Sequence, residues 1–236
     1  MKQALVITPV KDSIQSTLET IRAISTNQLN IEHIVYNDFS TQETKKKLEK
    51  NTEKLNFELI NLEDITNTPS PNYKLVLQLA QKLALKKRIP LIIVESDVTI
   101  KPDTFIKMLE FNKKTKKTGL VGAITVDHVG IVNFPYLKFK TNTDNIIDTN
   151  RSLSFCCTLL SVDFLEAYDF ENLNKTKDWY DTIISKKALE LNFKNYVLMQ
   201  APVEHKPHSS RPWKQLKYKN PFKYYLLKLI NKRDKI

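Results

Sequence analysis

The sequence is poor in glycine and cysteine, and it has no long apolar run. Its 236 residues include only three glycines, which excludes the glycine-rich loops that hold phosphates in Walker and dinucleotide-binding motifs. No segment approaches the roughly 18 consecutive apolar residues of a membrane span. The N-terminus also lacks the basic and then apolar pattern of a signal peptide. We therefore expect a cytoplasmic globular protein.

The only two cysteines, Cys156 and Cys157, are neighbours in the chain. A disulfide between adjacent residues would be strained, because its geometry requires a wider separation of the two backbones. The sequence therefore predicts two buried free thiols in a reducing compartment.

The net charge of +11 is concentrated at the C-terminus. Residues 211–236 hold nine Lys or Arg and one acid, whereas the other 28 basic and 25 acidic residues leave only +3. The same tail has an apolar helical stripe made of Phe222, Tyr225, Leu226, Leu229 and Ile230. It fits either an interfacial helix on anionic lipid or a helix packed on the body. Nucleic acid is not an expected partner, because no recognised binding module accompanies the charge.

Apolar segments at strand length alternate with helical patterns along the first hundred residues. The expected strands are 4–8, 31–36, 57–62 and 91–94. Asp12 or Ser13 is expected to cap the first helix, and the spacing of Ser40 and Glu43 predicts a capping box for the second. The alternation predicts an α/β fold with a mostly parallel sheet flanked by helices. We expect one domain over residues 1–210, followed by a basic amphipathic tail over 211–236.

The fourth apolar segment is continuous and ends at two carboxylates. Such a run is typical of a strand buried on both faces, and open α/β sheets bind ligands at the carboxyl ends of their strands. If the chain bends at Ser96, Glu95 and Asp97 can reach one Mg²⁺ or Mn²⁺ ion, which completes its shell with substrate phosphates. The other interpretation is an ordinary acidic turn.

Five short motifs follow one another along the chain: Thr8-Pro9-Val10-Lys11-Asp12, Asn37-Asp38-Phe39-Ser40-Thr41, Glu95-Ser96-Asp97, Asp178-Trp179-Tyr180-Asp181 and Val203-Glu204-His205. In this order they resemble the family-2 glycosyltransferases, which have the GT-A fold, over residues 3–210. They are similar to the first nucleotide-facing loop, the D-D-G-S-T segment, the D-x-D motif, the E-D pair and the late V-x-H. Glu95 stands in place of an aspartate and Phe39 in place of a glycine, and the E-D pair is not intact.

The resemblance implies an inverting hexosyltransferase of glycan biosynthesis that depends on Mn²⁺ or Mg²⁺. It would move a sugar from a UDP- or GDP-sugar to the hydroxyl of a glycan or other acceptor. The implied metal ligands are Asp97, Glu95 and His205. The implied nucleotide-sugar contacts are Pro9, Lys11, Asp38, Glu95, Ser96 and Arg211. Asp181 is the implied general base, with Asp178 as its competitor.

Several alternatives stay open at this level. Glu95 binds either the metal, a metal-bound water or the ribose, and Arg211 either clamps the diphosphate or begins the basic tail. His205 is either a ligand or an ordinary histidine. Because the E-D pair is altered, the other function is a degenerate, non-catalytic GT-A module that binds a glycan or an anionic membrane surface. A peripheral position on the cytoplasmic face of a membrane is the corresponding localisation.

Overall fold

The computed structural model describes residues 2–174, 179–206 and 220–230. Contacts divide the chain into two compact units, Met1–His205 and Lys206–Ile236. The predicted boundary after residue 210 lies outside the described residues. Within the described ranges, none of the helices combines the length and the apolar character needed to span a bilayer.

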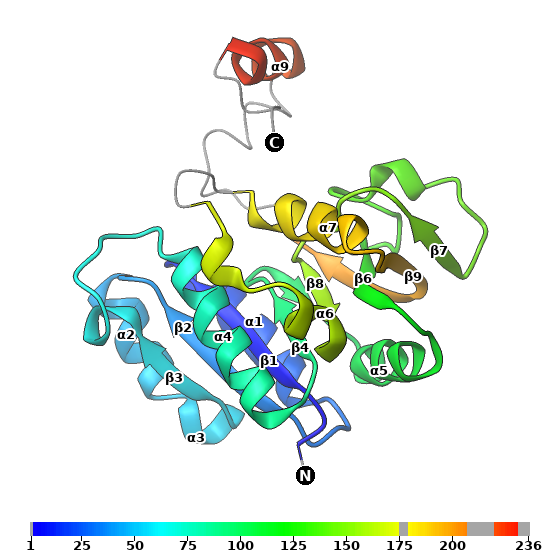
Figure 1. The fold of residues 1–236 in the computed structure, drawn as a ribbon. Helices are drawn as coiled ribbons and strands as arrows, with labels where there is room; N and C mark the ends of the chain where they lie inside the picture. Colours follow the sequence, from blue (N-terminus) through cyan, green and yellow to red (C-terminus); the bar gives the residue numbers. More distant parts are fainter. Residues whose placement is uncertain (1, 175–178, 207–219, 231–236) are drawn as a thin grey trace. The chain divides into compact units, whose positions relative to one another are not determined.

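The first unit is an α/β structure in which helices flank one nine-stranded sheet (Figure 1). Its strands are β1 Leu5–Val10, β2 Glu32–Asn37, β3 Glu58–Asn61, β4 Leu91–Val94, β5 Val98–Thr99, β6 Thr118–Val126, β7 Ile146–Thr149, β8 Cys157–Leu160 and β9 Lys194–His205. Its α-helices are α1 Ile14–Ser25, α2 Gln42–Glu49, α3 Thr52–Leu55, α4 Tyr73–Lys87, α5 Thr104–Lys114, α6 Val162–Ala167 and α7 Tyr180–Glu190. Short 3₁₀ helices are η1 Leu62–Asp64, η2 Leu137–Phe139 and η3 Phe170–Asn172.

The strand order is β3-β2-β1-β4-β8-β6-β9-β5, and β7 pairs with β9. The four strands from β3 to β4 are parallel, as the strand–helix alternation predicts. The other half of the sheet is mixed, because β8 runs antiparallel to both β4 and β6, whereas β6 and β9 are parallel. The chain enters β8 at the edge where β4 ends, with Cys157 opposite Val94, and must therefore run in the opposite direction.

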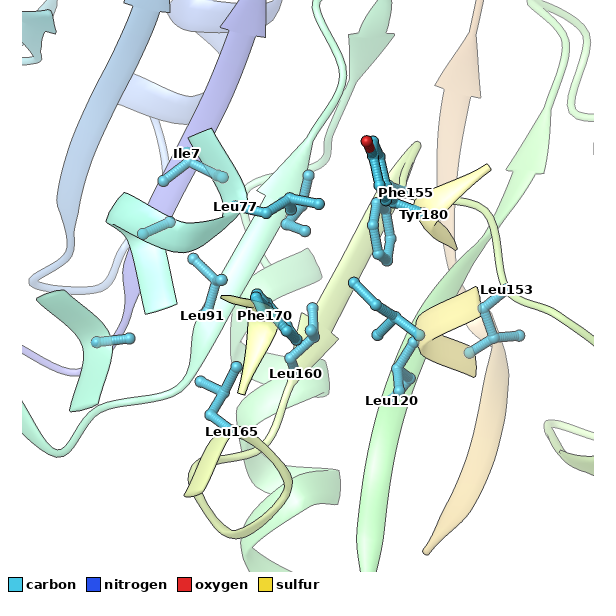
Figure 2. Packing of buried hydrophobic residues seen from close by; sticks show 14 of the residues in the cluster. Ile7, Leu77, Leu91, Leu120, Leu153, Phe155, Leu160, Leu165, Phe170 and Tyr180 are labelled. Atoms are coloured by element: carbon cyan, nitrogen blue, oxygen red, sulfur yellow. The ribbon is translucent and has the colours of Figure 1, made fainter. Parts of the chain in front are cut away.

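The core lies on both faces of the sheet, as expected when successive side chains of a strand point to opposite sides. Ile7 and Leu91 pack with Leu77 of α4 on one face (Figure 2). Val6 and Ile24 of α1 belong to the cluster on the other face. Helices cover both faces of the sheet. Polar side chains therefore gather at the carboxyl ends of the parallel strands.

The predicted helix caps are wrong in detail. The N-cap of α2 is Thr41, whose Oγ1 accepts a hydrogen bond from the backbone N–H three residues later at 3.4 Å. Ser40 Oγ instead accepts from the backbone N–H of Asp12 at 2.9 Å, and Asp12 Oδ1 accepts from the N–H of Thr41 at 2.8 Å. Ser13 occupies the N-cap position of α1 without a side-chain bond. The side chains of Asp12 and Ser40 therefore join the ends of β1 and β2 to each other.

The second unit contains α9, Pro221–Ile230. Phe222, Tyr225 and Leu226 of this helix are exposed, with 81%, 54% and 47% of their surface accessible. They lie three and four residues apart, so they share one side of the helix. The predicted apolar stripe is present on α9 as far as the structure describes its side chains.

Candidate active site

The central strand β4 ends in a tight turn that carries both predicted carboxylates. The backbone N–H of Val98 donates to the carbonyl of Glu95 at 3.2 Å, so the chain bends at Ser96 as predicted. The N–H of Glu95 donates to the carbonyl of Cys156 at 3.0 Å, which ties the turn to the segment that leads into β8. Asp97 is 2% exposed, whereas Glu95 is half-buried. A buried carboxylate requires a charged or hydrogen-bonding neighbour, so this turn is not an ordinary solvated one.

The neighbour of Asp97 is His205, and the sheet brings the two together. Directly after the turn, β5 pairs antiparallel with the end of β9, and Val98 lies opposite His205. The resulting distance from Asp97 Oδ2 to His205 Nε2 is 3.2 Å. This two-residue strand explains how residues more than a hundred positions apart in the sequence meet in one site.

His205 is held by the loop that follows β6. Its Nδ1 lies 2.7 Å from the carbonyl oxygen of Phe134, and the Asn133 side chain donates to the His205 carbonyl at 3.0 Å. A carbonyl can only accept, so Nδ1 carries a proton and Nε2 faces Asp97. This is the arrangement that metal-binding histidines use, with the second nitrogen fixed by a backbone carbonyl. The sequence does not reveal Phe134 as this partner.

The electrostatic surroundings of His205 favour a positive charge. Burial lowers the pKa of His205, but the hydrogen bond to Asp97 and the charges of Asp97 and Glu95 raise that pKa by more. The pKa of the imidazole therefore lies above its ordinary value, although only 5% of the residue is exposed. A proton or a metal cation satisfies the same two carboxylates.

A third side chain, Cys156, joins this group. Ligand atoms of Glu95, Cys156 and His205 all lie within 4.8 Å of one another. The Sγ of Cys156 is 3.6 Å from Glu95 Oε2. The sequence correctly predicts a buried free thiol here, but it does not place the thiol in the site, because that requires the antiparallel pairing of β8 with β4.

The donor atoms fit a divalent cation. Carboxylates suit Mg²⁺ and Mn²⁺, and an imidazole with a fixed tautomer favours Mn²⁺ over Mg²⁺, which prefers oxygen ligands. Asp97, Glu95 and His205 supply two carboxylates and one imidazole nitrogen within a single turn and a strand end. Asp97 and Glu95 each lie beside His205, Asp97 at 3.2 Å and Glu95 within 4.8 Å, and whether the three bind one ion stays a prediction.

Asp38 lies at the end of β2 and has its carboxylate already engaged. Ser70 Oγ and the Asn72 N–H donate to Asp38 Oδ2 at 2.7 and 2.8 Å, and the Asn72 side chain donates to Oδ1 at 2.8 Å. In this structure Asp38 fixes the loop before α4. Nearby, Lys11 Nζ donates to the carbonyl of Phe39.

The backbone at this edge of the sheet is strained. Asp12, Ser13 and Phe39 all have positive φ angles, of 56°, 52° and 55°. Left-handed conformations are costly for residues other than glycine, above all for a bulky residue such as Phe39. Such conformations concentrate at ligand sites, where the surrounding contacts enforce them.

Asp181 lies in the first turn of α7, where the helix dipole favours its ionised form. It is partly buried, and its Oδ1 accepts from the backbone N–H of Thr182 at 2.7 Å. Burial raises the pKa of the Tyr136 hydroxyl well above its ordinary value, and charges at Cys156 and Asp181 raise it further. Cys156 and Asp181 therefore both lie close enough to the Tyr136 hydroxyl to affect its pKa.

The start of α7 is anchored by aromatic side chains. The ring of Tyr73 lies 6.4 Å from that of Phe155 and 6.2 Å from that of Tyr180. Phe155 and Tyr180 belong to the same apolar cluster (Figure 2). The first turn of α7 is thereby held next to the segment that carries Cys156. Asp178 and Arg211 lie outside the described residues.

Comparisons with known proteins agree with this arrangement. The family model described as Glycosyl transferase family 2 matches residues 5–169. A search of curated proteins gave no match. Among solved structures, residues 1–349 of S. aureus TarS give a TM-score of 0.66 at 19% identity, covering 86% of this chain and 60% of that chain.

Two further structures share the fold. The mannosyltransferase PcManGT from Pyrobaculum calidifontis, in complex with GDP-Man and Mn²⁺, gives a TM-score of 0.66 at 12% identity, covering 90% of this chain and 59% of that chain. GalNAc-T7 with UDP, GalNAc and Mn²⁺ gives a TM-score of 0.64 at 12% identity, covering 87% of this chain and 44% of that chain. The chain thus spans no more than about 60% of these proteins. The predicted GT-A fold is confirmed, and the chain belongs to glycosyl transferase family 2.

Proposed function

We propose that this family-2 member is a metal-dependent, inverting glycosyltransferase that moves a sugar from a UDP- or GDP-sugar to an acceptor hydroxyl. The single observation that supports this most is that two carboxylates at the carboxyl end of the central strand, Asp97 and Glu95, both lie beside His205. A divalent cation held there would offset the negative charge that develops on the leaving diphosphate. The neighbours TarS, PcManGT and GalNAc-T7 were solved with UDP-GlcNAc, GDP-Man and UDP, respectively, in agreement with such a donor.

The chain's own residues divide the remaining work. Pro9, Lys11 and Asp38 lie at the ends of β1 and β2, beside β4, and we assign the nucleoside to this side of the site. Because Asp38 already accepts three hydrogen bonds, its contribution includes holding the loop from Ser70 to Asn72 in place. Ser96, buried in the turn, lies between the two carboxylates. Arg211, outside the described residues, is assigned to the diphosphate.

Asp181 is proposed as the general base. An acceptor hydroxyl is a poor nucleophile at neutral pH, so a carboxylate must take its proton as the new bond forms. Position in the first turn of α7 keeps Asp181 ionised and therefore competent. We expect Asp181→Asn to keep donor affinity while turnover falls by roughly 10²–10⁴. Asp178→Asn is the comparison: a loss in that variant alone moves the role to Asp178, and unchanged turnover in both variants removes the base from this segment.

The test of the proposed reaction is the release of nucleoside diphosphate from a panel of UDP- and GDP-sugars. We expect release by the wild-type chain with Mn²⁺, and loss of that release after chelation or in Asp97→Asn. Asp103→Asn is the matched control, because Asp103 is a half-exposed carboxylate six residues further on, paired with Lys107. Binding of a nucleoside diphosphate without release from any sugar donor would favour the non-catalytic module.

The second unit supports a further partner, an anionic membrane surface. Phe222, Tyr225 and Leu226 expose an apolar side of α9, and residues 211–236 carry a charge of +8. Each basic residue near anionic lipid contributes about 1 kcal/mol, screened by salt. The protein should bind vesicles that contain anionic lipid at low salt, less so at high salt, and not zwitterionic vesicles. A chain truncated after Ser210 should lose this binding. If the wild-type chain does not bind anionic vesicles at low salt, the membrane role is contradicted. The remaining interpretation is then a helix packed on the body.

A further inference from the structure

The two adjacent cysteines have opposite surroundings. Cys157 begins β8 and points into the apolar core, where its Sγ lies 3.9 Å from the sulfur of Met108. Burial raises the pKa of the Cys157 thiol to about 12, so it stays protonated. Cys156, one residue earlier, directs its Sγ toward Glu95 Oε2 at 3.6 Å. Only one of the two thiols therefore faces the candidate cation site.

Cys156 is positioned by a network that fixes the backbone on both sides of it. Tyr136 Oη accepts from the N–H of Ser154 at 3.1 Å, and Thr158 Oγ1 donates to the Ser154 carbonyl at 2.7 Å. The carbonyl of Cys156 itself accepts from the N–H of Glu95 at 3.0 Å. A side chain added at Gly122 would meet Tyr136 Oη at 2.7 Å, so a glycine at that position makes room for this hydroxyl. The thiol is thus held in place by the fold and does not depend on a flexible loop.

The thiol of Cys156 donates a hydrogen bond to Glu95 Oε2, and the spacing of the two atoms is also compatible with a shared metal ion. A tetrahedral Zn²⁺ ion bound at about 2.3 Å to sulfur and about 2.1 Å to oxygen keeps those two atoms roughly 3.6 Å apart. The observed separation of Cys156 Sγ and Glu95 Oε2 is 3.6 Å. A ring nitrogen of His205 lies within 4.8 Å of both. Nε2 is the ring nitrogen that can bind a cation, because Nδ1 donates to the carbonyl of Phe134. One sulfur, one nitrogen and one oxygen ligand with an open fourth position make a set that suits Zn²⁺.

We propose that Cys156, with Glu95 and His205, forms a site for a thiophilic divalent cation such as Zn²⁺. The inference deepens the proposed function, because Glu95 and His205 belong to both this set and the set completed by Asp97. An oxygen-preferring ion uses Asp97, and a thiophilic ion uses Cys156 after the thiol has released its proton to solvent. Since the two sets share two ligands, the two kinds of ion exclude each other. Zn²⁺ is therefore a competitor of Mn²⁺ at this enzyme.

The test uses Co²⁺ as a spectroscopic substitute for Zn²⁺, with the full chain and without any sugar donor. Binding through sulfur gives a thiolate-to-cobalt charge-transfer band, which oxygen and nitrogen ligands do not produce. We expect this band in the wild-type chain and its disappearance on addition of either Zn²⁺ or excess Mn²⁺. Cys156→Ser should lack the band and bind Zn²⁺ at least about tenfold more weakly, because even outer partners of a metal ligand are worth roughly 10–100-fold.

Cys157→Ala is the matched control, since it keeps Cys156 and removes the only other thiol of the chain. The band must persist in that variant. A band that survives in Cys156→Ser, or a wild-type chain that binds Co²⁺ without any sulfur band, would overturn the proposal. A band unaffected by excess Mn²⁺ would overturn the shared-ligand arrangement. None of these spectroscopic measurements depends on turnover. A failure of the Cys156 site can therefore be distinguished from a failure of Mn²⁺-dependent diphosphate release.

Discussion

Two histidines of this chain, His33 on β2 and His205 on β9, are equally buried at 5% exposure but have opposite charge preferences. Burial lowers the pKa of His33 to about 3, so it stays neutral. Its Nε2 lies 3.0 Å from Thr8 Oγ1, and its Nδ1 has no hydrogen-bond partner among the described residues. Burial acts on His205 in the same direction, yet its pKa is raised. The difference comes from Asp97 and Glu95, which only His205 has beside it.

The comparison shows that burial alone does not mark a functional site. A buried histidine among apolar and hydroxyl groups is part of the packing, whereas one that faces two carboxylates is part of a place that attracts a cation. The same contrast separates Asp38 from Asp97. Asp38 accepts hydrogen bonds from three donors, and Asp97 faces an imidazole nitrogen. The first carboxylate supports a loop, and the second is oriented toward a positive charge.

The largest expected effect concerns Asp38. Asp38→Ala removes the acceptor of three hydrogen bonds and leaves buried donors of Asn72 without it, so the free energy of unfolding should fall by about 3 kcal/mol. Asp97→Asn should change it by less than about 1 kcal/mol without metal, because the new amide can donate to His205 Nε2. Urea unfolding of both variants measures this difference. Equal losses in the two would show that both carboxylates are structural.

The next effect is a pH dependence that His33 should confer. The unfolded chain protonates this residue near its ordinary pKa of 6.5, whereas the folded chain does not until pH about 3. Between these values the unfolded state binds more protons, so stability falls as the pH falls, by up to about 1.4 kcal/mol per unit. From pH 6.5 to 5 the wild type should lose about 1.6 kcal/mol more than His33→Gln, which cannot titrate. If the free energy of unfolding changes equally with pH in the wild type and in His33→Gln, the neutral, buried state of His33 is contradicted.

The smallest effect tests the corrected helix start at the end of β2. Thr41→Ala removes the side-chain cap of α2 and should lower the free energy of unfolding by about 1 kcal/mol. Ser40→Ala, the control, removes only the acceptor of the Asp12 N–H and leaves the cap in place. Helix content measured by circular dichroism during unfolding should report the loss of the cap in Thr41→Ala alone. A larger effect in Ser40→Ala would restore the capping box that the sequence suggests.

The sequence predicts the first half of the fold well, because that half is built from local units. β1, β2 and β3 pair in chain order through one helix or two, and β4 then pairs with β1 in the same parallel direction. The alternation of strands and helices along the chain therefore carries the information. The second half depends on where loops enter the sheet. The antiparallel insertion of β8 between β4 and β6 joins segments that no local pattern connects.

The candidate site divides in the same way. The place of Glu95 and Asp97 in a turn after β4 was predictable, because two acids end a continuous apolar strand. His205 required the resemblance to a family, and Cys156 and the Phe134 carbonyl required the structure. Both of these reach the site through long-range pairing, of β8 with β4 and of the loop after β6 with His205. Site residues that meet only through the pairing of distant segments cannot be predicted from the spacing of residues in the sequence.

The measurement that tests the central claim most directly is a thermal-shift titration of the wild-type chain and Asp97→Asn with UDP and GDP, with and without Mn²⁺. A nucleoside diphosphate at a hundred times its dissociation constant stabilises the folded state by about 2.7 kcal/mol, or roughly 5–10 °C for a chain of this length. We predict such a shift for one of the two nucleotides in the wild type, only with Mn²⁺, and its absence in Asp97→Asn. An equal, Mn²⁺-dependent shift in Asp97→Asn would contradict the assignment of the cation site to Asp97, Glu95 and His205.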